Sequence, residues 1–243
     1  MTLLAGKEAV VTGGSRGLGA AIVARFASEG AAGTILDHVP AGDLPPGWTS
    51  LVVDVADDVG VAAAFAGLPT VDIVVAAAGI VPSWAGVAEA DLDTWDDVMR
   101  VNARGTLSTI KHAAGRLRDG GAIVAIGSLN SWRGDANIVS YVASKHAVLG
   151  IVRSAALELG RRGIRVNAVG PGPVATDALL ERMRTREREL GVPVADALAA
   201  AARQTALRRI ASIDEVAGAV LFLACDLSSG ITGHLLPVDG GIA

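Results

Sequence analysis

Seven short runs of β-branched and apolar residues recur along the chain, and segments with a helical pattern separate them. The runs are Glu8 to Thr12, Thr34 to Leu36, Leu51 to Val53, Ile73 to Ala77, Ala122 to Ile126, Arg165 to Val169 and Leu235 to Val238. Because they are apolar on both faces instead of alternating with polar residues, they are typical of parallel strands covered on both sides. The sequence therefore predicts the α/β class: a doubly wound, parallel, seven-stranded sheet with helices on both faces.

The composition indicates one folded domain. Hydrophobic residues make up 51% of the 243 residues and charged residues 19%, which is too apolar for a disordered chain. No Pro- or Ser-rich linker, charge block or repeat divides the chain, so we expect a single domain over residues 1–243. With 25 acidic and 21 basic side chains, the net charge of −4 argues against a nucleic-acid partner.

Neither a membrane span nor a secretory signal is indicated. The longest apolar candidate, Val216 to Ala224, is far shorter than the roughly 18 to 20 residues that a bilayer requires. The sole cysteine, Cys225, excludes an internal disulfide, and residues 1–8 lack the layout of a signal peptide. We therefore expect a cytoplasmic protein.

The first strand leads directly into an amphipathic helix. Leu18, Ile22 and Phe26 form one apolar stripe, and Gly30 ends the helix. The next connection, residues 38–50, contains three prolines and two glycines, so a crossover helix is not expected there. The adenosine end of a bound nucleotide would then be thinly covered, although an ordinary surface loop is an equally acceptable interpretation.

A glycine-rich loop joins the first strand to this helix. In Thr12-Gly13-Gly14-Ser15-Arg16-Gly17-Leu18-Gly19, glycines permit a tight turn, and the helix N-terminus favours a phosphate. An ordinary glycine-rich turn is the alternative, but the position between strand and helix favours a dinucleotide site.

Acidic residues at two strand ends bear on the choice of cofactor. Asp37 ends the second strand, where a carboxylate binds ribose hydroxyls and repels a 2′-phosphate, so it favours NAD over NADP. Arg16 favours NADP instead, because its positive charge could attract the 2′-phosphate. Asp54, after the third strand, is either an adenine contact or a turn-capping residue.

Tyr141 and Lys145 lie four residues apart at the start of a long helical pattern, so both project from one face. A phenol has a pKa of about 10, and a neighbouring ammonium favours its ionised form. Tyr141 is the only tyrosine, so no other phenol competes for the role of acid or base. A half-buried aromatic residue beside a solvated lysine is the alternative interpretation.

Over nearly its whole length the chain resembles the classical short-chain dehydrogenase/reductase family. The loop TGGSRGLG resembles the family pattern TGxxxGxG, Tyr141 and Lys145 match YxxxK, Ser128 lies 13 residues before the tyrosine, and Asn102 begins an NxxG stretch. The resemblance implies a Rossmann-like fold and four catalytic residues. Tyr141 would exchange a proton with the substrate oxygen, and Ser128 would hydrogen-bond that oxygen. Lys145 would lower the tyrosine pKa and bind the nicotinamide ribose, and Asn102 would support a proton-relay water. Taken singly, Ser128 could be a strand-end cap and Asn102 an ordinary helical polar residue.

The same resemblance implies a set of NAD-binding residues. They are Gly13, Ser15, Arg16, Gly17, Leu18, Gly19, Asp37, Asp54, Val55, Ala77, Gly79, Tyr141, Lys145, Pro171, Gly172, Val174 and Thr176. Pro171 and Gly172 could also be a plain turn. The chain departs from the family pattern after the fourth strand, where Ala76-Ala77-Ala78-Gly79 replaces NNAG. The missing asparagine side chains put the rigidity of this segment in doubt, but they do not bear on the reaction itself.

Three variable segments could line the substrate site: Val81 to Trp84, Leu129 to Arg133 and Pro173 to Met183. Trp84 and Trp132 could form apolar walls or pack on the surface, and we expect an uncharged, fairly apolar substrate. Residues 177–209 resemble a substrate lid whose charged face looks outward, with a merely solvated helix as the alternative.

The helix from Ser140 to Leu159 carries more apolar surface than one sheet contact requires. Family resemblance implies a homotetramer in which this helix and the one around Trp95 to Leu117 form an interface, whereas a thick monomer core is the alternative. The four histidines lack ligand spacing, so no metal site is expected.

Three functional hypotheses follow. The first is an NAD-dependent oxidoreductase that interconverts a fairly apolar secondary alcohol, with a cyclic alcohol as one option, and its ketone by hydride transfer. The second is an NADPH-dependent 3-oxoacyl thioester reductase, which Arg16 favours and Asp37 opposes. The third is a non-catalytic nucleotide-sensing protein, against which the four intact catalytic positions argue.

Overall fold

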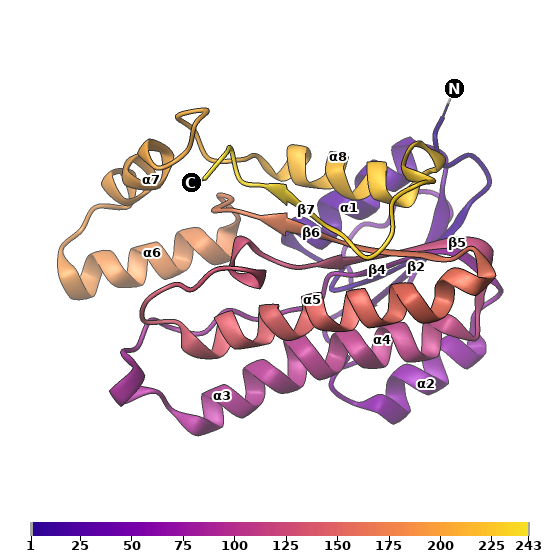
Figure 1. Cartoon of the computed structure of the whole chain (residues 1–243), viewed down its shortest axis with the longest axis horizontal. Helices are drawn as coiled ribbons and strands as arrows, with labels where there is room; N and C mark the ends of the chain where they lie inside the picture. The colour runs from indigo at the N-terminus through magenta and orange to yellow at the C-terminus, as the bar shows by residue number, and fades with distance from the viewer. Residues whose placement is uncertain (1, 243) are drawn as a thin grey trace.

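The computed structural model describes residues 2–242, and its framework is a single parallel sheet (Figure 1). The strand order is β3-β2-β1-β4-β5-β6-β7, and every neighbouring pair is parallel. The strands are β1 (Glu8–Thr12), β2 (Ala32–Asp37), β3 (Trp48–Val52), β4 (Val71–Ala76), β5 (Leu117–Ile126), β6 (Arg165–Pro171) and β7 (Leu235–Val238). The predicted α/β class and the seven-stranded parallel sheet are confirmed.

Helices cover both faces of the sheet. The chain forms α1 (Gly17–Ser28), α2 (Asp58–Gly67), α3 (Leu92–Val98), α4 (Gly105–Ala114), α5 (Val139–Leu159), α6 (Asp177–Leu190), α7 (Val194–Arg203) and α8 (Ile213–Ala224). In Figure 1, α1 and α8 lie above the sheet, whereas α2, α4 and α5 lie below it. Strand order reverses between β1 and β4, and ligands of such sheets bind outside the carboxyl ends of the strands at this switch point.

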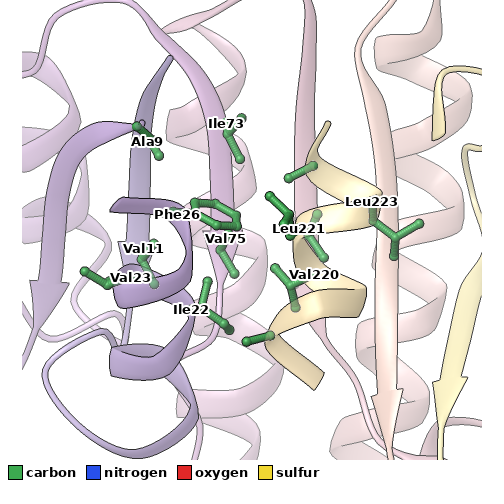
Figure 2. Close-up of a cluster of buried hydrophobic side chains, with 14 of the residues drawn as sticks. Ala9, Val11, Ile22, Val23, Phe26, Ile73, Val75, Val220, Leu221 and Leu223 are labelled. Carbon is green, nitrogen blue, oxygen red and sulfur yellow. The ribbon is translucent and has the colours of Figure 1, made fainter. Parts of the chain in front are cut away.

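Two apolar cores result, one on each face. On the upper face, Ile22 and Phe26 of α1 and Val220 of α8 pack on Val11 and Val75 of the sheet, as Figure 2 shows. The predicted stripe of the first helix therefore lies on the sheet, as the spacing requires. On the lower face, side chains of α2, α4 and α5 cover Val10, Val74 and Ile123. The central strands are thus buried on both sides.

The edge strands depart from the prediction of burial on both faces. Leu51 and Val52 of β3 are 43% and 64% exposed. No described crossover helix covers them, because residues 38–47 between β2 and β3 form a loop, as their prolines and glycines predicted. The strand β5 begins at Leu117, earlier than the predicted Ala122, because Leu117 still pairs with Val71 before a register shift.

Two helical segments also differ from their predicted bounds. The predicted helix around Trp95 to Leu117 is divided into α3, a π-helical turn over Met99–Arg104 and α4, which ends at Ala114. Residues 177–209 form two helices, α6 and α7, which extend beyond one end of the sheet (Figure 1). None of the helices in the described part of the chain is long and apolar enough to cross a membrane.

A buried arginine joins the sheet to the end of α8. The Arg165 guanidinium, on β6, donates hydrogen bonds to the carbonyl oxygens of Leu223, Ala224 and Cys225 and to Ser228 Oγ at 2.6 to 3.3 Å. The last turn of a helix leaves its carbonyls without intrahelical partners, and a cation there also interacts favourably with the helix dipole. Arg165 therefore stabilises the end of α8 that packs on the sheet.

We predict that Arg165→Met lowers the free energy of unfolding by about 2 to 4 kcal/mol, because it leaves buried carbonyl oxygens without donors. Urea denaturation followed by circular dichroism measures this loss. Arg161→Met, at an exposed position four residues away, is the matched control and should change the value by less than about 0.5 kcal/mol. Equal losses in the two variants would contradict the proposed role of Arg165.

Candidate active site

The phosphate-binding candidate lies where β1 gives way to α1. The loop fits tightly around its glycines: a Cβ added at Gly13 would lie 2.7 Å from Ala78 Cα, and one at Gly19 would lie 2.0 Å from the Gly13 oxygen. At Gly17, by contrast, no described atom outside its chain neighbours and the backbone of its own helix lies within 4 Å of such a Cβ. No side chain caps the N-terminus of α1 among the described residues, and its first turn carries no acidic residue. The free N–H groups and this open space fit a pyrophosphate.

Asp37 is held at the end of β2 beside this loop. Its carboxylate accepts hydrogen bonds from the backbone N–H groups of Ser15 (3.0 Å) and Val39 (3.3 Å), and its side chain is 4% exposed. His38 Nδ1 lies 3.1 Å from the same carboxylate. Arg16 is exposed in the loop. The negative group is therefore fixed in place, whereas the positive group is on the surface.

Asp54 and Val55 are occupied by local contacts. Asp54 Oδ1 accepts from the Ala56 N–H at 2.9 Å, and Oδ2 lies 3.4 Å from Arg100 Nη1, so the aspartate caps its own turn. The Val55 side chain packs against Gly105 of α4. An adenine contact from this segment would therefore come from the Val55 backbone.

The segment after β4 is fastened by Thr12, a residue to which the sequence assigned no function. Thr12 Oγ1 accepts hydrogen bonds from the N–H groups of Ala77 (3.1 Å) and Ala78 (3.3 Å). Thr12 is buried, and it ends the strand next to β4. Its hydroxyl therefore immobilises the backbone of the Ala76-Ala77-Ala78-Gly79 segment, where the family pattern has asparagines.

Asn102 lies in the π-helical turn before α4 and fastens the next residues. Its Oδ1 accepts from the Ile80 N–H (2.8 Å), and its Nδ2 donates to the Ile80 oxygen (2.9 Å) and to Ser144 Oγ of α5 (3.1 Å). Its backbone carbonyl oxygen accepts a hydrogen bond from Thr106 Oγ1 at 2.7 Å. Short π-helical turns occur frequently at functional sites.

Ser128, Tyr141 and Lys145 meet beyond the carboxyl end of β5. The hydroxyls of Ser128 and Tyr141 share a side-chain hydrogen bond, and Lys145 Nζ lies 5.6 Å from the centre of the tyrosine ring. Lys145 is 5% exposed, and its Nζ donates to the Ile126 oxygen at 2.8 Å. A Cβ at Gly79 would lie 3.2 Å from Asn102 Oδ1 and 3.7 Å from Lys145 Nζ, so glycine leaves space there for a ribose.

Burial changes the acidity of both helix residues. It raises the pKa of the Tyr141 phenol, while the hydrogen bond with Ser128 and the positive charge of Arg182 act in the opposite direction. Burial also lowers the pKa of Lys145 to about 8, because the charged ammonium is poorly solvated. The phenol therefore depends on surrounding donors and cations for ionisation, as a proton-transferring group requires.

The nicotinamide side of the candidate site follows β6. Pro171 ends β6, and a Cβ at Gly172 would approach Asp239 Cα to 2.9 Å, so this turn requires glycine. Val174 is buried and forms a bridge with Ala211. Thr176 caps α6, accepting from the Leu179 N–H at 3.3 Å, and its hydroxyl proton is left to donate to a carboxamide or phosphate.

The expectation that the charged face of residues 177–209 looks outward is wrong at one position. Arg184 and Arg188 are exposed, but Arg182 turns inward and places its guanidinium carbon 4.0 Å from the ring centre of Trp84. Arg182 belongs to the segment 173–183 that was expected to line the substrate site, but the sequence did not single it out because it lies in a run of alternating charges. The signal was its spacing from Leu179 and Met183, with which it shares the less exposed face of α6.

The two tryptophans also have distinct positions. Trp84 is half-buried beneath Arg182, whereas Trp132 is 45% exposed and lies over Gly170 of β6.

Within residues 2–242, no three His, Cys, Asp or Glu side chains lie close enough to hold a metal ion.

Comparison with known proteins identifies the family. Residues 13–243 match the family model described as enoyl-(acyl carrier protein) reductase. The chain is 38% identical to (+)-cis,trans-nepetalactol synthase NEPS2 of Nepeta racemosa, over 98% of this chain and 94% of that protein. It is 37% identical to cis-4-hydroxycyclohexanecarboxylate dehydrogenase of Sinomonas cyclohexanicum, over 97% and 96% of the two chains.

A solved structure agrees with these relatives. Carveol dehydrogenase from Mycobacterium avium, in complex with NAD, superposes with a TM-score of 0.89 at 29% identity and covers 99% of each chain. The chain therefore belongs to the short-chain dehydrogenase/reductase family, as its motifs indicated.

The ionisation of Tyr141 can be measured directly, because it is the only tyrosine. We predict that its pKa lies above the ordinary value for a phenol in the free protein and rises further in Ser128→Ala, which removes a hydrogen bond that favours the phenolate. Ultraviolet absorbance of tyrosinate against pH gives both values.

Ser131→Ala is the matched control for this titration. Ser131 Oγ accepts from the Ser128 N–H at 3.1 Å but has no part in the hydrogen bond with the phenol, so its removal should leave the pKa of Tyr141 unchanged. A pKa that falls in Ser128→Ala would mean that the serine hydroxyl favours the neutral phenol.

Proposed function

We propose that this chain is an NAD-dependent oxidoreductase that interconverts a cyclic, fairly apolar secondary alcohol and its ketone. The observation that carries the proposal is the hydrogen-bonded pair of Ser128 and Tyr141 beside the buried Lys145, at the same sheet edge as the glycine-rich loop. The names of the dehydrogenase relatives, which refer to a hydroxycyclohexanecarboxylate and to carveol, support a ring alcohol.

Each residue of the proposed catalytic set has a separate task. Bound NAD would supply the acceptor for the hydride of the carbinol carbon during oxidation. The Tyr141 phenolate removes the hydroxyl proton of the substrate and returns it in the reverse direction. The Ser128 hydroxyl donates a hydrogen bond to the substrate oxygen as its charge changes. Lys145 supplies positive charge and binds the nicotinamide ribose, and Asn102 holds the π-helical turn and a proton-relay water.

The cofactor is NAD, because Asp37 presents a fixed carboxylate where the adenosine ribose hydroxyls would lie. The remaining proposed contacts are those of the glycine-rich loop for the pyrophosphate, Ala77 and Gly79 along the ribose, and the 171–176 segment for the nicotinamide. We further propose that residues 177–209, the helices α6 and α7, act as the lid that closes over the substrate.

We also propose that the protein is a cytoplasmic homotetramer. Leu107 of α4 and Leu157 of α5 are 50% and 84% exposed, and Val142, Ile151 and Ala155 are only half-buried. A second copy packing on α4 and α5 would bury this surface. The free, buried Cys225 is consistent with a reducing compartment.

We predict that the purified protein reduces NAD with a panel of cyclic secondary alcohols and that Tyr141→Phe lowers kcat by at least about 1,000-fold. Nicotinamide absorbance measures turnover, and NADH fluorescence measures binding. The variant should still bind NADH, because the loop of α1 and Asp37 are unchanged. Binding of NADH by the wild type without turnover of any alcohol would instead favour the non-catalytic nucleotide sensor.

A second prediction concerns cofactor choice. Asp37→Asn should reduce the preference for NAD over NADP by about tenfold or more, because it removes the charge that repels a 2′-phosphate, a change of about 1.4 kcal/mol. The ratio of kcat/KM for the two cofactors measures this preference. Asp43→Asn, in the exposed loop that follows β2, is the control and should leave the ratio unchanged. A wild type that prefers NADP and turns over 3-oxoacyl thioesters would support the reductase hypothesis.

A further inference from the structure

Arg182 is a half-buried cation, and two of its nitrogen atoms have no hydrogen-bond acceptor among the described residues. Its Nε and Nη2 atoms are inaccessible to solvent and have no partner among the described residues. Burying donors of a charged group without acceptors costs free energy, and native proteins rarely leave such groups unsatisfied. Because these two atoms are closed to solvent, an acceptor on a ligand can reach them only when α6, part of the proposed lid, moves.

Two neighbouring side chains hold the guanidinium in position. One face stacks on the Trp84 ring, with 4.0 Å between the guanidinium carbon and the ring centre. Because the N–H donors of arginine lie in the guanidinium plane, stacking leaves these donors directed to the side. Trp84 therefore orients Arg182 without satisfying its hydrogen bonds.

The carboxylates of the chain do not satisfy Arg182 either. Asp135 is the one acidic residue with a resolved electrostatic effect on it, but no ion pair within 4.0 Å joins Arg182 to any described carboxylate. Asp135 Oδ2 instead accepts from Asn130 Nδ2 at 3.3 Å. Near the catalytic serine, Asn130 Oδ1 is likewise buried and without a partner.

Arg182 adjoins both the catalytic phenol and an open cavity. Its charge acts on Tyr141. It also lines a cavity of about 310 Å³ together with Trp84, Asn137 and Arg186. A second guanidinium, that of Arg186, lies 5.3 Å from the Trp84 ring centre, so two cations and one carboxylate, that of Glu189, border this space. A molecule that reaches from the Ser128–Tyr141 pair toward this cavity would present its far end to Arg182.

We propose that Arg182 binds a carboxylate on the substrate, at a position remote from the reacting alcohol. This inference rests on the proposed function and narrows its substrate class to cyclic hydroxy acids. The fork of a guanidinium matches a carboxylate with two parallel hydrogen bonds, and the alicyclic body would pack on Trp84. The uncharged substrate expected from the sequence is thereby replaced by an apolar ring with one acidic substituent.

Direct binding tests this site without requiring turnover. Cyclohexanecarboxylate and its methyl ester, which have no reacting hydroxyl, are titrated calorimetrically into the wild type saturated with NADH. We expect the carboxylate to bind at least tenfold more tightly than the ester and Arg182→Met to abolish the difference. Arg182→Lys should keep part of it, because the charge is retained without the fork.

Arg184→Met is the matched control, because Arg184 is exposed on the same helix and pairs with Glu181 at 3.2 Å. It should bind the carboxylate as the wild type does. The dissociation constant for NADH should be the same in all variants. If Arg182→Met weakens NADH binding and leaves carboxylate binding unchanged, Arg182 belongs to the cofactor site and the proposal is overturned.

Turnover separates this proposal from the proposed function. The kcat/KM for 4-hydroxycyclohexanecarboxylate should exceed that for its methyl ester by at least tenfold, and this ratio should fall to about one in Arg182→Met. Equal kcat/KM values for acid and ester in the wild type would overturn the carboxylate site while the dehydrogenase stands. Tight, Arg182-dependent carboxylate binding without turnover of any ring alcohol would keep the site and overturn the dehydrogenase.

Discussion

The structure depends on seven strands running in the same direction. Because the carboxyl ends of all seven strands lie at one edge of the sheet, residues that are far apart in the sequence lie close together at this edge. Asp37 and Pro171 end β2 and β6, whereas Gly79 and Ser128 follow β4 and β5. The apolar packing that fixes the sheet between α1 and α8 on one side and α2, α4 and α5 on the other therefore also fixes the site.

Buried hydroxyl and amide groups hold the backbone segments that follow the strands in place. Thr12 binds the backbone after β4, and Asn102 joins the same segment to α5. These bonds make the Ala76-Ala77-Ala78-Gly79 segment rigid through backbone donors, although it has no asparagine side chains. Local rigidity, which the sequence put in doubt, is supplied by a residue on the neighbouring strand. A polar group held by several buried partners positions a cofactor more precisely than a mobile side chain would.

Much of the framework could be predicted from local patterns. Apolar runs indicated each strand, and prolines indicated the loop between β2 and β3, because both effects act within a few residues. Helix spacing placed Tyr141 and Lys145 one turn apart on α5. The exposure of Leu51 and Val52 could not be read in this way, since it depends on which strand occupies the sheet edge.

The substrate side was the least predictable part. Arg182 lies in a run of acidic and basic residues that is typical of a solvated helix, and its inward position depends on how α6 packs against Trp84, about a hundred residues earlier in the chain. The role of Thr12 depends on the pairing of β1 with β4. The positions of side chains whose partners come from distant segments could therefore be found only in the structure, whereas the motif residues could be found in the sequence.

In the proposed reaction, a hydride passes directly from a ring carbinol carbon to NAD while Tyr141 removes the hydroxyl proton. The most direct test uses a cyclic secondary alcohol that carries deuterium on the carbinol carbon, with nuclear magnetic resonance of the reduced nicotinamide as the readout. We expect the deuterium to appear on one face of the nicotinamide ring, in proportion to the ketone formed. Ketone formation with deuterium released to water, or product formation without any reduced cofactor, would contradict it.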